Sequence, residues 1–123
     1  MQPASVVAID GPGGLAPFVG VDAQVCGRPV IVPLMGGTPA AKPVEYQIAN
    51  PQAHLPLGVP QLLVLADLGD LMKPYIAAAE ASADPVLTLA PSGANHFDIV
   101  TPSTTSGKAV VAFTAENARL APK

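Results

Sequence analysis

The sequence predicts a small α/β fold, in which a parallel sheet of about three strands is flanked by helices. Three short apolar runs lack polar alternation, which is typical of parallel strands that are covered on both faces. An alanine-rich stretch between the second and third runs indicates a helix that connects two parallel strands. The 15 prolines and 11 glycines form no repeat and separate these segments by turns.

The first predicted strand is the run from Ser5 to Asp10, which ends at the turn signal Gly11-Pro12-Gly13-Gly14. The stretch from Leu15 to Ala53 contains prolines at positions 17, 29, 33, 39, 43 and 51, and these exclude a long uninterrupted helix. We therefore expect short helical turns and loops that cross one face of the sheet.

The rest of the chain predicts a strand–helix–strand unit and a last helix. The second run, Gln61 to Ala66, and the third, Pro85 to Ala90, flank a helix over 70–82 in which Pro74 suits the first turn. The crossover should be right-handed. The last helix is expected from near Ser106 to Arg119, with a buried face of Ala109, Val110, Phe113 and Leu120.

Composition predicts one folded domain over residues 1–123. A chain of this length has the commonest domain size. Half of the residues are apolar and only 12% are charged, which excludes disorder caused by excess charge. The net charge of −3, without any run of Lys or Arg, offers no electrostatic surface for nucleic acid or an anionic membrane. We expect neither as a partner.

The sequence contains no targeting signal that we can identify. No basic N-terminal region precedes an apolar stretch, and no apolar run reaches the roughly 18 residues of a spanning helix. The expected location is the cytoplasm. The one cysteine, Cys26, cannot form an intramolecular disulfide, and we expect it to pack as a small apolar residue in or near a core.

Candidate catalytic residues follow two of the predicted strands. Asp70 comes just after the second run and His96 just after the third. Adjacent parallel strands lie about 4.8 Å apart, so the loops after them should be neighbours at the ligand-binding edge of the sheet. A carboxylate there can accept the imidazole Nδ1–H, which leaves Nε2 as a general base. The sequence predicts His96 as the base and Asp70 as its acid, with Asp67 as the reserve candidate.

The segment from Asn50 to Asp98 resembles the distal part of bacterial esterase/lipase α/β-hydrolases. Asp70-Leu71-Met72-Lys73-Pro74 keeps that family's spacing from aspartate to proline after a strand. Gly93-Ala94-Asn95-His96-Phe97 is similar to the family's glycine–any–glycine–histidine–phenylalanine segment around the triad histidine. The resemblance implies the C-terminal part of an α/β-hydrolase, with the acid before the histidine in the chain and small esters as substrates.

The chain departs from the family pattern at several positions. The family's His-Gly at the strand end is replaced by Ala66-Asp67, or by Leu65-Ala66 in an ungapped alignment that puts Gly69 at the acid position. Asn95 replaces the second glycine before the histidine. No Gly-x-Ser-x-Gly nucleophile pentapeptide is present. In the family this elbow precedes the region of resemblance, so we expect a C-terminal fragment that is inactive alone.

Two functional classes stay open, together with a chance match of an unrelated α/β domain. In the first class, His96 and Asp70 serve ester hydrolysis once a nucleophile-bearing half is supplied. In the second class, the chain is a non-catalytic binding or assembly module derived from the same fold. We expect no cofactor, and no metal because no metal-ligand spacing is present. The unpaired first strand, Val6 to Ile9, predicts a homodimer or a complex with a separate N-terminal half through that edge.

Overall fold

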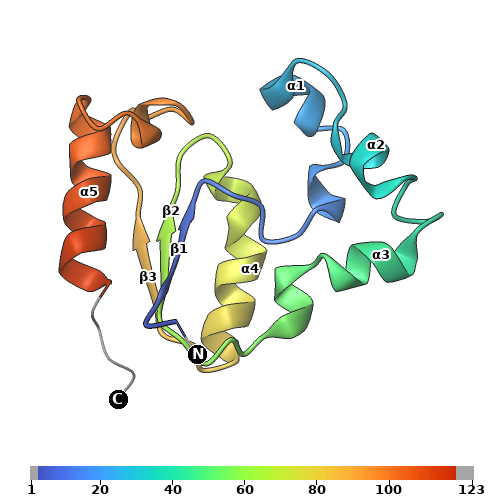
Figure 1. The fold of residues 1–123 in the computed structure, drawn as a ribbon, viewed down its shortest axis with the longest axis horizontal. Helices are drawn as coiled ribbons and strands as arrows, with labels where there is room; N and C mark the ends of the chain where they lie inside the picture. The colour runs from blue at the N-terminus through green and yellow to red at the C-terminus, as the bar shows by residue number, and fades with distance from the viewer. Residues whose placement is uncertain (1–2, 119–123) are drawn as a thin grey trace.

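The computed structural model describes residues 3–118, in which three strands stand between two longer helices and beside several short ones (Figure 1). The elements in chain order are β1 (Val6–Ile9), η1 (Ala16–Phe18), α1 (Asp22–Cys26), α2 (Ile31–Met35), α3 (Pro43–Ile48), η2 (Pro51–His54), β2 (Gln61–Val64), α4 (Gly69–Ala81), β3 (Val86–Leu89), η3 (Asp98–Val100) and α5 (Thr105–Asn117). Each helix among the described residues is too short or too polar to cross a bilayer.

The three strands form one parallel sheet in the order β1–β2–β3. Val6 pairs with Gln61 and Gln61 pairs with Val86, and the pairing continues residue by residue to the end of each strand. The central strand β2 is buried at all four positions, which accounts for the consecutive apolar residues that follow Gln61. The predicted fold class, a small parallel sheet flanked by helices, is confirmed.

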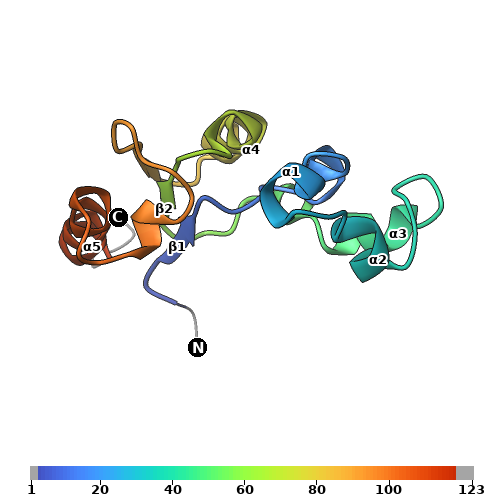
Figure 2. The same cartoon turned by 90° about the horizontal axis from the view of Figure 1, so that it is seen from above.

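Helices cover the two faces of the sheet (Figure 2). On one face Leu63 packs against α4, in a buried cluster with Met72, Tyr75 and Ala79. The next residue, Val64, points to the opposite face because strand side chains alternate. It packs there with Ile99 of η3 and Val110 of α5.

The last helix agrees with the sequence expectation where the structure describes it. α5 begins at Thr105, and its N-cap Thr104 accepts a side-chain hydrogen bond from the Gly107 N–H. Val110 is buried, and Ala109 and Phe113 are half-buried. Arg119 and Leu120, which the prediction also included, lie outside the described residues.

A buried polar network fixes the strand–helix–strand unit at the amino ends of the strands. Tyr75 Oη donates to Gln61 Oε1 at 2.6 Å, and Gln61 Nε2 donates to Asp84 Oδ2 at 2.9 Å. The Asp84 carboxylate also accepts the N–H groups of Leu57 and Gly58. Burial, reinforced by the charge of Asp84, raises the pKa of Tyr75. The network therefore joins β2 and α4 to the residues that precede β2 and β3.

Residues 16–54 form a helical lobe to one side of the sheet, although the sequence predicted that they cross one of its faces (Figures 1 and 2). The short helices themselves were predicted correctly, since proline and glycine divide them: Gly27 and Gly36 end α1 and α2 in left-handed conformations. The lobe has its own buried cluster of Phe18, Ile31 and Tyr46, which includes Leu68 from the start of α4. The short helices thus pack their apolar faces against one another and against Leu68, and no residue of the three described strands belongs to this cluster.

One carboxylate holds the first part of the lobe together. Asp22 is 5% exposed, and its Oδ2 accepts the N–H of Val30 at 2.7 Å and of Ile31 at 2.9 Å. Its Oδ1 accepts the N–H of Gly20 at 3.1 Å. The hydrogen bonds from Ile31 and Val30 hold the pKa of Asp22 below its ordinary value of 3.8. The start of α2 is thus tied to α1 through the Asp22 carboxylate.

We expect replacement of Asp22 by asparagine to destabilise the protein near neutral pH and to weaken the acid dependence of its stability. The folded-state pKa of Asp22 is lowered, so its contribution is present above 3.8 and is lost as the pH falls below that value. Thermal melting of wild type and D22N at several pH values measures this difference. Glu116→Gln, at an exposed position of α5, is the control. A melting difference that stays constant across this pH range would contradict the assignment.

Candidate functional site

Asp10 follows β1 directly and lies buried at the carboxyl end of the sheet, 1% exposed. Its φ of 46° is left-handed, a conformation that aspartate adopts more readily than most residues. Its N–H donates to the Val64 carbonyl at 2.7 Å, which holds this turn against the end of β2. The backbone therefore positions the Asp10 side chain at the edge where α/β sheets bind ligands.

The loops after the other two strands donate hydrogen bonds to the Asp10 carboxylate. Oδ1 accepts the N–H of Ala66 at 2.8 Å and of Leu68 at 3.1 Å. Oδ2 lies 2.8 Å from His96 Nδ1. An ionised carboxylate can only accept, so Nδ1 carries the hydrogen in this pair and Nε2 is the free nitrogen of a neutral imidazole. Within residues 3–118, Nε2 has no hydrogen-bond partner.

Further contacts fix His96 and the turn that carries it. Its own N–H donates to Asp67 Oδ2 at 2.9 Å. The Asn95 side chain accepts the N–H groups of Phe97 and Asp98, which fixes the turn on either side of the histidine. The rings of His96 and Phe97 meet edge to face, with centroids 5.7 Å apart. The imidazole is thus held from both the main chain and the ring, while a third of its side-chain surface stays exposed.

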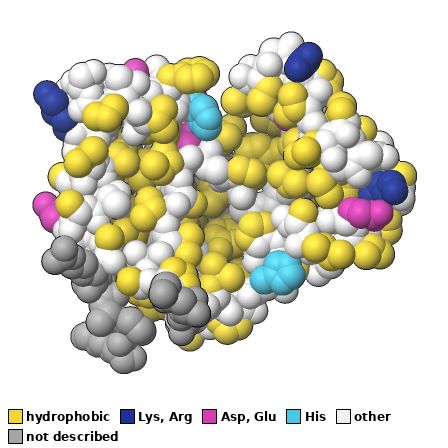
Figure 3. Space-filling model, viewed as in Figure 1, with side chains coloured by type: hydrophobic (Ala, Val, Ile, Leu, Met, Phe, Trp, Pro, Cys, Tyr) yellow, Lys and Arg dark blue, Asp and Glu magenta, His cyan; other side chains and the backbone are white. Residues whose placement is uncertain are grey.

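An apolar cavity of about 270 Å³ lies beside the Asp10–His96 pair. Ile9, Phe18 and Ile31 are among the side chains from β1 and the lobe that form its walls. Figure 3 shows apolar side chains gathered in the hollow between the lobe and the rest of the molecule, with histidine and acidic side chains at its upper rim. The residues that line the cavity, all of them described, include neither serine nor threonine.

Cys26 lines the same cavity and is exposed, although the sequence predicted a packed position in or near a core. It lies at the end of α1, where Gly27 turns the chain in a left-handed conformation. The short helix α1 buries Asp22 and leaves its last residue at the surface. A thiol is therefore the one side chain lining this cavity that belongs to the nucleophilic types Ser, Thr and Cys.

The structure corrects the assignment of Asp70 as the acid that contacts His96. Asp70 lies in the first turn of α4 with its side chain 89% exposed, and its carboxylate pairs with Lys73 one turn later at 2.6 Å. That hydrogen bond holds the pKa of Asp70 below its ordinary value. The reserve candidate, Asp67, contacts the main chain of His96 and not its ring. The ring contacts Asp10 instead.

Sequence reasoning selected His96 as a candidate and did not select Asp10, the residue that contacts its ring. The signal was present, because Asp10 is the acid that ends the first predicted strand, just as Asp67 and Asp70 follow the second run. The adjacency of the second and third strands favoured Asp70, whereas the loop after β3 reaches across to the end of β1. Among the described residues, no group of three or more His, Cys, Asp or Glu side chains is placed to hold a metal ion.

No protein-family model, curated protein or solved structure matches this chain.

We expect Asp10, and not Asp70, to set the tautomer of His96. In Asp10→Asn the ionised acceptor of the Nδ1–H is lost, so the neutral imidazole should shift toward the form protonated at Nε2. In Asp70→Asn the tautomer should stay as in wild type, because Asp70 contacts Lys73. The ¹⁵N chemical shifts of the imidazole nitrogens measure both. An unchanged tautomer in Asp10→Asn would refute the Asp10–His96 pair.

Proposed function

We propose that the chain supplies the histidine and the acid of a serine-hydrolase site of the carboxylesterase or lipase type, without the nucleophile. In this proposal the chain corresponds to the C-terminal part of an α/β-hydrolase, the family that its Asn50–Asp98 segment resembles. His96 is the general base, and Asp10 takes the role that the sequence suggested for Asp70. The observation that carries the proposal is the 2.8 Å contact between His96 Nδ1 and the buried Asp10 carboxylate.

This pair has the chemical features that a general base needs. The carboxylate fixes the tautomer and stabilises the imidazolium that forms when Nε2 takes a proton. The apolar cavity beside it would accept the acyl or alcohol part of a small ester, since it offers apolar walls with the histidine at one side. Neutral esters fit these walls better than charged substrates.

This site lacks the serine nucleophile of a serine hydrolase. The sequence has no Gly-x-Ser-x-Gly elbow, and neither serine nor threonine lines the cavity. A partner that added a parallel strand to the free edge of β1 would bring the carboxyl end of that strand next to Asp10. A separate N-terminal half that binds in this way would complete the site in trans.

A homodimer through the same edge would not complete it. Two copies of β1 related by a two-fold axis pair antiparallel in a regular ladder. Their carboxyl ends then lie at opposite ends of the pair, and so do the two His96 side chains. We therefore favour the separate nucleophile-bearing half as the partner in catalysis, and the homodimer belongs to the alternative function.

We expect the chain alone to hydrolyse p-nitrophenyl acetate no faster than the buffer does. With trifluoroethanol added as an external nucleophile, the rate should exceed that of His96→Ala by about tenfold. This is below the roughly 10²–10⁴-fold effect of a base whose nucleophile is held in place. The alcohol needs a base to remove its proton, and His96 Nε2 is the free nitrogen. Release of p-nitrophenolate measures the rate.

Three variants make this experiment decisive. Asp10→Asn should lose most of the stimulation, whereas Asp70→Asn should keep it, because Asp70 contacts Lys73 and not the imidazole. Cys26→Ser should also keep it, since the proposal gives the thiol no part. If the rate with trifluoroethanol is the same in wild type and His96→Ala, His96 is not a general base. Turnover by the chain alone that His96→Ala abolishes would overturn the expected inactivity.

The alternative function is a non-catalytic assembly module, which one observation favours. β1 is an edge strand, and within residues 3–118 no strand pairs with its outer side. Two of its four side chains, Val7 and Ile9, are 37% and 38% exposed. An apolar edge strand with free main-chain groups is a site for association with another strand.

For the assembly function we expect a dimer in size-exclusion chromatography with light scattering. Val7→Lys should give a monomer, because a charge on an edge strand opposes pairing. Val111→Lys on α5 is the matched control, since Val111 is exposed on a helix away from β1, and it should leave the dimer intact. A wild-type protein that is monomeric at all accessible concentrations would exclude this homodimer.

A further inference from the structure

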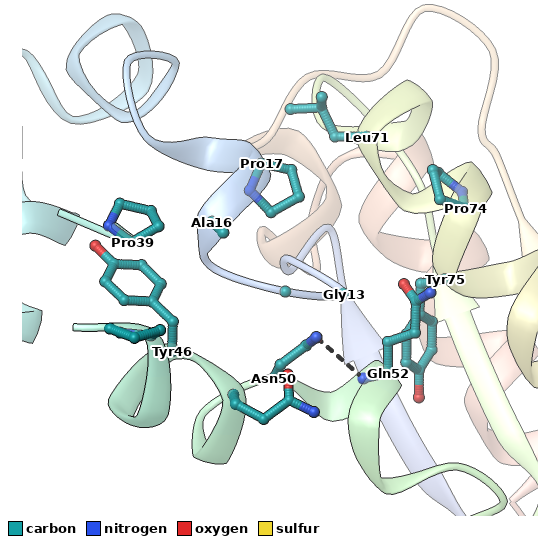
Figure 4. Close-up of a pocket in the computed structure, with 13 residues that line it drawn as sticks. Gly13, Ala16, Pro17, Pro39, Tyr46, Asn50, Gln52, Leu71, Pro74 and Tyr75 are labelled. Atoms are coloured by element: carbon teal, nitrogen blue, oxygen red, sulfur yellow. Dashed lines mark hydrogen bonds between the residues drawn. The ribbon is translucent and has the colours of Figure 1, made fainter. Parts of the chain in front are cut away.

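A second cavity, of about 280 Å³, lies between the lobe and α4 and shares no lining residue with the cavity at His96. Figure 4 shows Asn50 and Gln52 between Tyr46 on one side and Tyr75 on the other, facing the chain from Gly13 to Pro17. Three separate segments therefore build it: the connection after β1, the stretch 39–52 that includes α3 and the start of η2, and the first half of α4. Because the three segments are far apart in the sequence, the cavity exists only in the folded chain.

Glycine and proline give this cavity fixed walls. A side chain at Gly13 would collide with Tyr75, and a Cβ at Gly14 would lie 2.7 Å from Asn50 Oδ1. The connection after β1 can thus approach α4 and η2 closely only because both residues lack side chains. Prolines from all three segments line the rest of the wall, and their rings restrict the backbone there. The cavity is therefore largely preformed.

The side chains that line this cavity, all described, carry no charge. A charged ligand would lose its hydration without gaining an ion pair, so the cavity favours an uncharged one. The two tyrosine hydroxyls are already used: Tyr46 donates to the Gly37 carbonyl, and Tyr75 donates to Gln61. The tyrosines thus contribute ring surface, and the polar groups open to a ligand come from elsewhere.

Those polar groups are carboxamides. Asn50 Oδ1 accepts the Gln52 N–H at 3.2 Å, which leaves the Asn50 amide nitrogen as a donor. Gln47 and Gln52 are exposed residues whose side-chain amides have no hydrogen-bond partner within residues 3–118. Each amide places a donor beside an acceptor. A ligand that pairs with it at both atoms must itself carry an acceptor beside a donor.

We propose that this cavity binds a small uncharged amide, with its N–H and C=O edge toward these carboxamides and its apolar body against the prolines and Leu71. A sugar has the same donors and acceptors, but it would bury hydroxyl groups against the proline rings and Leu71 without partners. An amide has one polar edge and one apolar body, as the cavity does. This binding site is independent of the hydrolase proposal.

Titration with three neutral probes, followed by ¹H–¹⁵N correlation spectra of the full chain, tests this site. 2-Pyrrolidinone carries adjacent N–H and C=O groups, cyclopentanone keeps the ring without the N–H, and methyl α-glucoside offers hydroxyls. We expect 2-pyrrolidinone to shift the signals of residues 46–52 and 71–75 with a Kd about tenfold below that of cyclopentanone, the effect of an additional hydrogen bond. The glucoside should cause smaller shifts.

A double variant separates the carboxamides from the cavity shape. Gln47→Leu with Gln52→Leu should raise the Kd for 2-pyrrolidinone about tenfold and raise that for cyclopentanone less, because the ketone has no N–H bond to lose. Gln24→Leu, an exposed glutamine that does not line this cavity, is the control and should bind as wild type does. Absence of shifts at these residues, equal affinity for lactam and ketone, or tighter binding of the glucoside would each overturn the proposal.

Discussion

The ends of all three strands are held together by one buried carboxylate. Asp10 ends β1, and it accepts hydrogen bonds from Ala66 and Leu68 after β2 and from His96 after β3. Burying an ionised group is unfavourable unless donors surround it, so these contacts depend on one another. The geometry of His96 and the closure of this edge of the sheet therefore rest on the same interaction. A change at Asp10 would alter both.

The secondary structure around this interaction could be predicted from local patterns. The second and third apolar runs became β2 and β3, and the alanine-rich stretch became α4, because strand and helix propensities act over a few neighbouring residues. Burial on both faces, which the runs also predicted, holds for β2, whereas the residues of β3 are half-buried or exposed. The acid could not be predicted in this way. Asp10 and Asp70 both follow strands, and only the direction of each side chain separates them. A left-handed φ turns Asp10 inward, whereas the first turn of α4 directs Asp70 toward Lys73 and solvent.

In the lobe, too, the helices could be predicted from local sequence, whereas their arrangement depends on contacts between distant residues. Its prolines and glycines predict short helices, and the structure contains them. Their direction depends on Asp22, which binds the start of α2, and on the cluster of Phe18, Ile31 and Tyr46 that includes Leu68. The lobe then serves two cavities: it supplies apolar walls near His96 and carboxamides in the second cavity. A lobe lying flat on the sheet would have built neither.

The sheet topology also determines the order in which the site can form during folding. β2 and β3 are joined by α4 alone, whereas β1 must pair with β2 across the whole lobe. Closing the longer loop has the higher entropic cost, so contacts between β2, α4 and β3 should form before β1 is added. His96 would then be in position next to the unit of β2, α4 and β3 before Asp10 joins it. We accordingly expect the Asp10–His96 contact to form late in folding, once β1 has joined the sheet.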